Sequence, residues 1–512
     1  METAYTFITR FADFLLRKKR PLFILGGLTV LGAITAVAMG VLQKFPNSAD
    51  EYLYLYQART FLAGRFWYPA HPFQDFFEFA WLVNKNGRVF SQYPPGWPLV
   101  LAAGMFLKIP ACLIGPLTGT LSLGALFLLG KKVYGPRIAL LAAGLTFFTS
   151  FFVFNSASYF SHTFCSLILI LFVYSSLNFE DTLKSRDAAF SGFLFAVAFI
   201  TRPLSALLCG LLVFLHLLPG LRKAPRKLLP FLAGMLPVLA FLLFYDASLT
   251  GNPFLLPMLL FKQNQAWGTN FVQIRRLIEY LKSLFEWMPA SFPILYFFYV
   301  FREFLPGRKS SSRHLLMGSF FILQIAGYFF YGQYAGNGYG PRYYYEVFPF
   351  LVLFITGSLF NENTGSQKSL PGKILFLLFL ISLPLSAPQW VAHFKTERAV
   401  ILERTDLYRS VERQGIKNAI IFIRYGIGTI RPMWVFDLVR NDPGYQNSVL
   451  YARDLGRRNE KLMRFYPEKI YYRYIYNKVL RQGSFTGIFP GSRPYSGNSY
   501  TNTLPPRKFR PV

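Results

Sequence analysis

Acidic residues are scarce in this chain. It holds 24 aspartates and glutamates against 54 lysines and arginines, which gives a formal net charge of +30. In a soluble protein, such an excess would indicate nucleic acid as a partner. Here the basic residues stand in short clusters between apolar runs, so membrane topology and anionic lipid explain them better. We therefore expect no nucleic-acid partner.

Cysteines and the motifs of nucleotide or zinc chemistry are also scarce. The three cysteines, Cys112, Cys165 and Cys209, lie inside apolar runs, where they resemble small core residues and not a disulfide framework or a metal site. The chain has no Walker-type loop, GxGxxG, HExxH or paired CxxC. The sequence therefore predicts no certain cofactor and leaves a divalent metal open.

Apolar and aromatic residues are abundant instead. Of the chain, 53% is hydrophobic, 19% aromatic and only 15% charged, which is typical of a protein that crosses a membrane many times. The basic residues 17–20 precede the first apolar run, 22–42, and basic residues stay on the cytoplasmic side. We expect a multi-pass protein of the plasma (inner) membrane with a cytoplasmic N-terminus and a retained signal anchor.

Later apolar runs alternate with basic clusters, and this alternation predicts about 11 crossings. The run 189–219 is broken at Thr201-Arg202-Pro203 and is expected to form two short helices, out and back. The stretch 97–130 is ambiguous: two full spans conflict with cytoplasmic Lys131 and Lys132, whereas one span plus a re-entrant or surface segment does not. The further expected spans are 138–155, 159–177, 228–245, 284–301, 315–331, 347–360 and 374–391.

The C-terminal part differs in composition and is expected outside the cytoplasm. Strand-like patterns at 418–423, 448–451 and 469–473, with a helical stretch at 456–465, predict a small α/β domain. From Gly483 onward, Gly, Ser, Pro and Asn predict a flexible tail. The expected fold class is an all-α polytopic membrane protein with a helical outer loop and a small C-terminal α/β domain. Its expected divisions are 1–391, with the outer loop at 43–96, then 392–482 and 483–512.

The outer loop 43–96 carries most of the unusual chemistry. Asp50 and Glu51 follow the first span directly, and the stretch from Glu51 to Gly64 has the spacing of an amphipathic helix on the membrane surface. Together with other outer helix ends, the loop places many polar groups on one side of the membrane. A transporter needs such groups near the midplane, whereas an enzyme acting on lipid-linked substrates needs them at one interface. The polar groups on the predicted outer side are Asp50, Glu51, Asp75, Glu78, Asn155, His162, Arg202, Arg342 and Glu346.

Sugar transfer from a phosphate-linked donor needs a base for the acceptor hydroxyl and cations for the leaving phosphate. Asp50 or Glu51 could be the base, although both could equally cap the surface helix. Arg202 and Arg342 could bind phosphate, and the alternative for Arg202 is a snorkelling side chain. Tyr343 could stack on a sugar or belong to an interfacial aromatic belt.

Three motifs, in this order, are similar to those of the GT-C superfamily of membrane glycosyltransferases, in particular the protein O-mannosyltransferase and aminoarabinose transferase clan. They cover roughly residues 20–390. The motifs are Asp50-Glu51-x-x-Tyr54 with Ala58 and Gly64, Gln92-Tyr93-Pro94-Pro95-Gly96-Trp97-Pro98-Leu99, and Gly340-Pro341-Arg342-Tyr343 with Pro349. The resemblance implies Asp50 as the catalytic carboxylate, with Arg202 and Arg342 on the lipid phosphate. Our candidate substrate-binding residues are Tyr54, Asp75, Glu78, Tyr93, His162 and Tyr343.

The sequence departs from this family at Tyr93. Relatives commonly have Lys or His before the Pro-Pro pair, and tyrosine cannot supply that charge, so the donor could differ or another cation could substitute. We expect a transferase that moves a sugar from a polyprenyl-phosphate donor to a protein, lipid or glycan acceptor of the cell envelope, on the outer face and with inversion. Alternatives are a ligase or polymerase of lipid-linked oligosaccharide, a transporter or flippase of lipid-linked sugars, and a structural assembly subunit.

Overall fold

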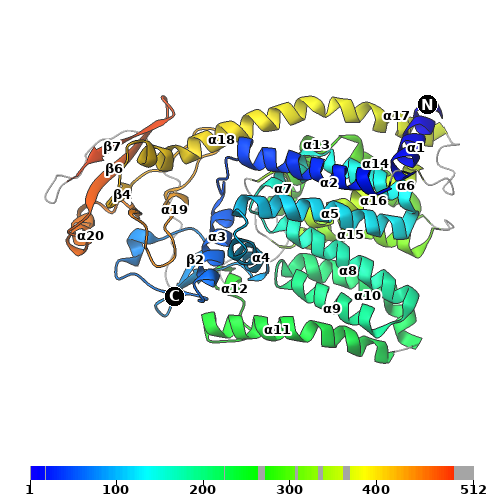
Figure 1. Ribbon diagram of the computed structural model, residues 1–512, viewed down its shortest axis with the longest axis horizontal. Coiled ribbons are helices and arrows are strands. Elements are labelled where there is room, and N and C mark those ends of the chain that lie inside the picture. The colour runs from blue at the N-terminus through cyan, green and yellow to red at the C-terminus, as the bar shows by residue number, and fades with distance from the viewer. Residues whose placement is uncertain are drawn as a thin grey trace.

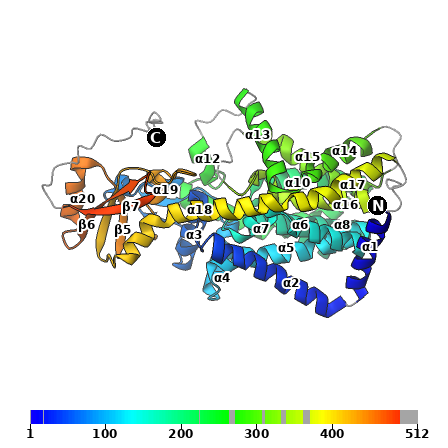
Figure 2. The same cartoon turned by 90° about the horizontal axis from the view of Figure 1, so that it is seen from above.

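The computed structural model consists of a helical bundle joined to a smaller sheet domain (Figure 1). It describes residues 2–17, 19–223, 225–262, 271–305, 310–331, 338–360 and 370–488. In both views the bundle lies on one side and the C-terminal sheet on the other, and the long helix α18 (Ala387–Arg413) connects them (Figures 1 and 2). Helix α3 (Ala49–Leu62) lies between the two parts.

The bundle is built from apolar helices. Seven helices in the described residues are long and apolar enough to cross a membrane, or up to nine if two bent pairs each form one span. Its helices are α1 (Glu2–Arg17), α2 (Lys19–Ala36), α4 (Gly96–Phe106), α5 (Ala111–Tyr134), α6 (Pro136–Phe147), α7 (Ser150–Ala157), α8 (His162–Thr182), α9 (Ser185–Phe199), α10 (Pro203–Lys223), α11 (Leu228–Thr250), α13 (Phe271–Trp287), α14 (Ser291–Glu303), α15 (Ser312–Phe329), α16 (Phe348–Phe360) and α17 (Leu370–Leu385).

The difference from the expected 11 crossings has a structural origin. Helix α9 has only 15 residues, and α15 has Arg313 and His314 in its first turn, so neither counts as a span by length and hydropathy. Both nevertheless pack within the bundle, α9 against α8 and α11 and α15 against α10 and α16. The fold class is confirmed as a largely helical membrane protein with a small C-terminal sheet.

The ambiguous stretch 97–130 contains one long helix and one short one. Helix α5 is long enough to span, whereas α4 has 11 residues and is too short. This arrangement corresponds to the expected alternative of one span plus a shorter segment. The break at 201–202 is also present, between α9 and α10. The stretch 246–282, between the expected spans 228–245 and 284–301, is largely helical in its described residues: α11 continues to Thr250, and α12 (Pro257–Lys262) and part of α13 follow.

The bundle has two chemically different ends. Helix α8 runs from His162 at one end to Thr182 at the other, a rise of about 30 Å for its 21 residues. Near Thr182, which we call the far end, Lys132 and Arg313 both pair with Asp181. The sequence analysis expected Lys132 on the cytoplasmic side, and the structure places Arg313 beside the same carboxylate. The basic side chains of residues 17–20 lie outside the described side chains.

The outer loop 43–96 is more structured than expected. Besides α3 it forms a short 3₁₀ helix, η2 (Gln74–Phe77), and an antiparallel sheet of order β1-β3-β2, from β1 (Tyr68–Pro69), β2 (Leu82–Lys85) and β3 (Arg88–Ser91). The expectation of a surface amphipathic helix is wrong in one respect. Most residues of α3 are buried, because α4, β3 and the C-terminal domain cover it.

The C-terminal domain has the expected alternating elements. Strands β4 (Ala419–Ile423), β5 (Val449–Arg453), β6 (Ile470–Asn477) and β7 (Gln482–Gly487) form a sheet of order β5-β4-β6-β7, with α19 (Val435–Leu438) and α20 (Asn459–Phe465) between strands. Strand β4 pairs in parallel with β5 and β6, while β6 and β7 are antiparallel. Residues 483–487, expected in a flexible tail, therefore belong to the sheet. The rest of that expected tail, 489–512, lies outside the described residues.

Candidate functional site

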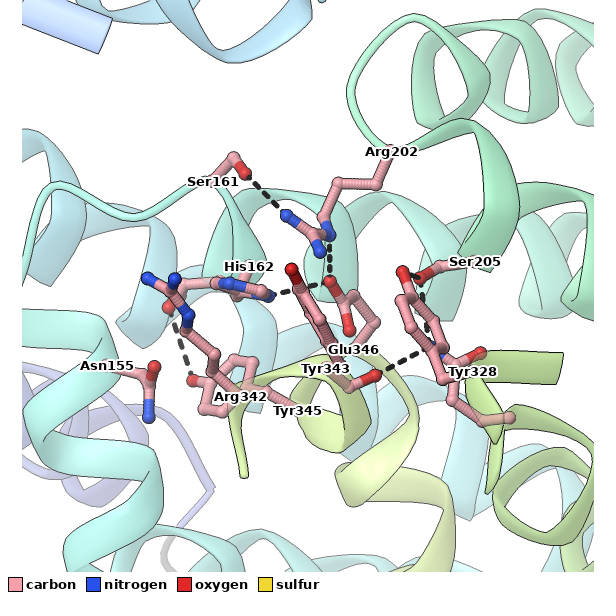
Figure 3. A network of polar contacts seen from close by, with 12 residues as sticks. Asn155, Ser161, His162, Arg202, Ser205, Tyr328, Arg342, Tyr343, Tyr345 and Glu346 are labelled. Carbon is pink, nitrogen blue, oxygen red and sulfur yellow. Dashed lines mark hydrogen bonds and ion pairs between the residues drawn. The ribbon is translucent and has the colours of Figure 1, made fainter. Parts of the chain in front are cut away.

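Three segments, far apart in the sequence, meet at the end of the bundle opposite Thr182. The first is the start of α3, which carries Asp50; the second is the break between α9 and α10, which carries Arg202. The third is the 3₁₀ helix η4 (Arg342–Val347), which leads into α16. The residues around Arg202, His162 and Glu346 point toward one another in Figure 3. We call this end of the bundle the site end.

Asp50 forms the first cluster with Arg342 and Tyr93. Arg342 Nη2 lies 2.8 Å from Asp50 Oδ2, and the Tyr93 hydroxyl donates to Asp50 Oδ1 at 2.5 Å. Burial raises the pKa of Tyr93 well above its ordinary value, so this hydroxyl keeps its proton and donates. The Asp50 side chain keeps 19% of its surface exposed, whereas that of Arg342 keeps 8%. Of the two, Asp50 is therefore the more accessible to a reacting group.

Arg202 and Glu346 form the second cluster. Arg202 pairs with Glu346 Oε1, which also lies 2.7 Å from His162 Nδ1 (Figure 3). The carboxylate is fully buried, while the Arg202 side chain keeps 14% exposure. A carboxylate and a guanidinium buried at a membrane boundary are costly unless paired. Glu346 thus holds Arg202 in place with one face still reachable.

Hydroxyl groups link the two clusters. Arg202 Nη1 donates to Ser161 Oγ at 3.4 Å, and Ser161 Oγ lies 3.1 Å from the Tyr54 hydroxyl. The Tyr54 ring in turn packs on Tyr93, with ring centroids 4.9 Å apart. Burial raises the pKa of Tyr54 to about 12, so its hydroxyl stays neutral. Asp50 and Arg202 therefore belong to one connected site.

The Pro-Pro turn sits directly against the break that carries Arg202. The Gly96 amide donates to the Ile200 carbonyl at 2.9 Å. A Cβ atom at position 96 would lie 2.3 Å from Thr201 Oγ1 and 2.9 Å from the Ile200 oxygen. Such distances leave no room for a side chain. The glycine of this motif thus lets the turn that carries Tyr93 approach Arg202.

Buried side-chain amides bind the backbone of η4 and of the segment just before it. Gln324 Nε2 donates to the Tyr343 carbonyl at 2.9 Å, and Asn155 Nδ2 donates to the Tyr339 carbonyl at 2.8 Å. Tyr343 stacks on Tyr328 at 4.8 Å, and the Arg202 guanidinium lies 5.5 Å from the centroid of the Tyr343 ring. Tyr343 thus reaches the site, as expected, and also supports Arg202 by a cation–π contact.

Unpartnered donors remain on the buried arginine of the first cluster. Within the part of the chain that the structure describes, Arg342 Nε and Nη1 are buried without a hydrogen-bond partner, although Nη2 pairs with Asp50. Buried polar atoms normally find partners, so such atoms in a polar site indicate a place for a ligand. A guanidinium with further N–H donors can make charge-assisted hydrogen bonds to a phosphate group.

Glu51 caps α3. Its carboxylate accepts from the Ser48 amide at 2.9 Å and the Tyr159 amide at 3.1 Å, while Ser48 Oγ accepts from the Glu51 amide. This reciprocal arrangement is a capping box. Burial raises the pKa of Glu51 to about 7, although the Tyr159 and Ser48 hydrogen bonds oppose this rise. Of the two candidate bases, only Asp50 has the surroundings of a reacting group.

Asp75 and Glu78 lie elsewhere. Asp75 pairs with Arg458 and Glu78 pairs with Arg453, both from the C-terminal domain. All four side chains are partly exposed. The structure therefore uses these two candidate residues to join the outer loop to the C-terminal domain and does not bring them to Asp50. Within the described residues, no group of three or more His, Cys, Asp or Glu is placed to hold a metal ion.

The sequence analysis missed several residues of the site. Glu346 was grouped with the other polar residues of the predicted outer side but received no role, and its pairing with Arg202 has no signal in the sequence. Ser161 next to His162, and the trio Ser205, Gln324 and Tyr328, were not identified. Polar residues inside apolar runs, such as Gln324 in α15, are the signal that could have found them.

Comparisons with known proteins give the following matches. Residues 430–487 match a domain of unknown function, and no curated protein matches the chain. ArnT from Cupriavidus metallidurans, solved bound to undecaprenyl phosphate, is 13% identical with a TM-score of 0.48, covering 79% of this chain and 82% of that chain. The archaeal oligosaccharyltransferase AglB from Archaeoglobus fulgidus, solved with an inhibitory peptide and a dolichol-phosphate, is 11% identical with a TM-score of 0.48, covering 88% and 69%.

The arabinofuranosyltransferase AftD from Mycobacteria is 13% identical with a TM-score of 0.42, covering 88% of this chain and 35% of that chain. Residues 93–245 match the family of dolichyl-phosphate-mannose-protein mannosyltransferases. This segment includes the Pro-Pro turn, His162 and Arg202. The match confirms, for these residues, the resemblance to membrane glycosyltransferases of the GT-C superfamily that the sequence motifs predicted.

Proposed function

We propose that this protein is a membrane glycosyltransferase that moves a sugar from a polyprenyl-phosphate-linked donor to an acceptor of the cell envelope. The observation that carries the proposal is the convergence of one accessible carboxylate, Asp50, with two guanidinium groups, Arg202 and Arg342, at one end of an apolar bundle. The matched mannosyltransferase family supports a lipid-linked donor. We place the reaction on the extracytoplasmic face of the plasma membrane, because the basic clusters lie at the far end.

In the proposed reaction, Asp50 takes the proton from an acceptor hydroxyl. The hydroxyl oxygen then bonds to the anomeric carbon of the sugar while the bond from that carbon to the phosphate oxygen breaks. The polyprenyl phosphate leaves with the bonding electrons, and attack opposite the leaving group inverts the configuration. Arg342 and Arg202 stabilise the negative charge that develops on the phosphate.

Arg342 has a double role in this scheme. Its Nη2 pairs with Asp50, and in the proposal its Nε and Nη1 donate hydrogen bonds to phosphate oxygens. One rigid guanidinium would thereby set the distance between the base and the leaving group, which is how orientation lowers a barrier. Tyr93 donates a neutral hydrogen bond to Asp50 and so replaces the cation common at this position in relatives.

Arg202 is the second phosphate ligand in the proposal. Glu346 and His162 fix its position from the buried side, so they act as positioning residues. Tyr54 and Tyr343 line the same space and are our candidates for sugar contacts. We assign Asp75 and Glu78 to the joint with the C-terminal domain and not to the donor site.

The test uses purified protein in lipid with a panel of polyprenyl-phosphate sugars and an envelope extract as acceptor. We expect the wild type to consume one donor and Asp50→Asn to lose that turnover by about 10²–10⁴-fold. Asp181→Asn is the matched control, because this carboxylate pairs with cations at the far end. Equal turnover in wild type and Asp50→Asn would contradict the assignment of the base.

The competing flippase function makes a different prediction for access to the site. A single cysteine placed next to Arg202 should react with a membrane-impermeant reagent from one side only, with or without donor. Labelling that moves to the other side on adding donor would favour transport.

A further inference from the structure

The bundle contains a cavity that lies apart from the residues of the proposed sugar-transfer site. It has a volume of about 320 Å³ and lies between α8, α9, α10 and α11. Its lining is apolar except for Ser176, Ser191 and Lys227. This volume is within the range of ligand pockets, which begin at about 300 Å³. The cavity therefore has the size and lining of a binding site for an apolar group.

The cavity is elongated along the bundle. Its lining on α10 extends from Leu207 to Leu221, which corresponds to about 20 Å along a helix. That length is about two thirds of the hydrocarbon thickness of a bilayer. Leu207, Leu211 and Phe214 line it and are also exposed on the outer surface of the bundle. The cavity thus opens sideways, toward the region where lipid chains lie.

One end of the cavity is basic. Lys227 lies at the far end, where α10 has ended and α11 begins, and donates to the Leu183 carbonyl at 2.9 Å. Arg222, Lys223 and Arg226 are exposed beside it. In the described part of the chain none of these four cations has a carboxylate partner, whereas Lys132, Arg137 and Arg313 at the same end are all paired. Lys227 thus lines the far end of the cavity, and the other three cations of this group lie close to it in the sequence.

The two serines are satisfied by each other and leave the interior apolar. Ser176 Oγ and Ser191 Oγ lie 2.6 Å apart. Close helix packing shapes the space, since a Cβ atom on Gly210 would lie 2.4 Å from the Phe195 ring, which lines the cavity. The site thus has one cationic end and a long apolar interior, which is the complement of an anionic lipid.

We propose that this cavity binds an anionic phospholipid of the surrounding membrane, with its phosphate at Lys227 and Arg226 and one acyl chain between α8, α9 and α10. The polyprenyl donor is not the expected occupant, because its phosphate belongs at Arg202 and Arg342, at the other end of the bundle. Juxtamembrane basic residues attract anionic lipid with about 1 kcal/mol each. The choice of occupant rests on the proposed function, whereas the cavity and its basic end do not depend on it.

The test is native mass spectrometry of the full-length protein with equal amounts of phosphatidylglycerol and phosphatidylcholine of the same chain length. We expect preferential retention of phosphatidylglycerol by the wild type. Arg226→Gln and Lys227→Gln should each weaken retention about fivefold, the equivalent of that 1 kcal/mol. Lys131→Gln is the control, since this exposed lysine at the same end does not line the cavity.

A second variant tests the interior. Val213→Phe fills the cavity and should remove lipid of either head group, whereas Leu236→Phe, on an exposed position of α11 outside the cavity, should not. A thermal shift on adding phosphatidylglycerol to each folded variant gives an independent readout. Equal retention of both lipids by the wild type, or no effect of Lys227→Gln and Arg226→Gln, would overturn the proposal. Displacement of phosphatidylglycerol by undecaprenyl phosphate would overturn the choice of occupant.

Discussion

At the far end of the bundle, Arg313 pairs with Glu180 and Asp181 where all three side chains are partly exposed. At the site end, Arg202 pairs with a Glu346 that is completely buried. Exposed pairs contribute little to stability, whereas a buried pair costs desolvation free energy and persists when geometry or function requires it. The same residue types therefore form partly exposed ion pairs at one end of the bundle and a buried ion pair at the other.

The largest effect is expected from a substitution of Arg342 at the site end. Arg342→Gln removes the guanidinium that holds Asp50 and has donors free for phosphate, so we expect donor turnover to fall by about 10²–10³-fold. Arg342→Lys should keep part of the activity, because it retains the charge but not the two-pronged geometry. Arg313→Gln at the far end is the control and should leave turnover unchanged. Equal losses for Arg342→Gln and Arg313→Gln would mean that the two ends do not differ in function.

Next in size is the stability effect of Glu346. Glu346→Gln leaves Arg202 without its buried partner, so we expect a loss of about 3–5 kcal/mol in the free energy of unfolding. Glu180→Gln removes one partly exposed partner of Arg313 and should cost less than about 1 kcal/mol. Thermal unfolding of both variants in the same detergent measures the difference. A Glu346→Gln protein as stable as the wild type would show that the buried pair has no net role in stability.

A smaller effect is expected at Gly96. Gly96→Ala brings a methyl group against Thr201 and the Ile200 carbonyl, and such overpacking costs about 1–3 kcal/mol. Because the strain separates Tyr93 from Arg202, turnover should fall together with stability. The matched control is Gly124→Ala in α5, where a Cβ meets nothing within 4 Å and alanine favours the helix. Undiminished turnover in Gly96→Ala would mean that the contact between the turn and the break is not needed for catalysis.

The smallest effect concerns the joint between the outer loop and the C-terminal domain. His71 Nε2 lies 2.8 Å from the Tyr466 hydroxyl, and burial lowers the pKa of His71 from 6.5 to about 4. Because the pKa of His71 is lower when the outer loop and the C-terminal domain are in contact, protonation of His71 favours their separation. The contribution of His71 to the stability of this contact is therefore complete above pH 6.5 and is lost as the pH falls through 4. The protection factors of β1 to β3 and α20, which are hydrogen-exchange rates corrected for the intrinsic effect of pH, should therefore fall on acidification. His71→Phe should show less pH dependence, and an unchanged dependence would assign it to other groups.

The sequence analysis anticipated the fold because its signals are local. The break at Thr201-Arg202-Pro203 follows from one polar residue and one proline inside an apolar run, and β4 follows from five consecutive apolar residues. Each pattern is readable within a few residues. The number of spans was harder, because a short helix such as α9 depends on its neighbours for burial.

The adjacent carboxylates Asp50 and Glu51 show what a local sequence pattern cannot predict. Asp50 and Glu51 differ by one position, yet the helix turns their side chains about 100° apart, so one faces Arg342 and the other Ser48 and Tyr159. The motif could not distinguish a base from a helix cap, since acidic residues favour both places. The sequence analysis assigned Asp75 and Glu78 to the site only because of their charge. Their arginine partners lie more than 370 residues later in the chain.

The sequence by itself determined the membrane-crossing architecture, the outer loop and the small C-terminal sheet, because hydropathy and charge act over one helix or strand at a time. It also determined that Asp50, Arg202 and Arg342 share one end of the bundle. Only the tertiary structure decided the partners: Arg342 with Asp50, Glu346 with Arg202 and His162, and Glu51 with its helix. Ion pairs depend on distances of a few ångströms between segments that the chain brings together only when the whole bundle packs.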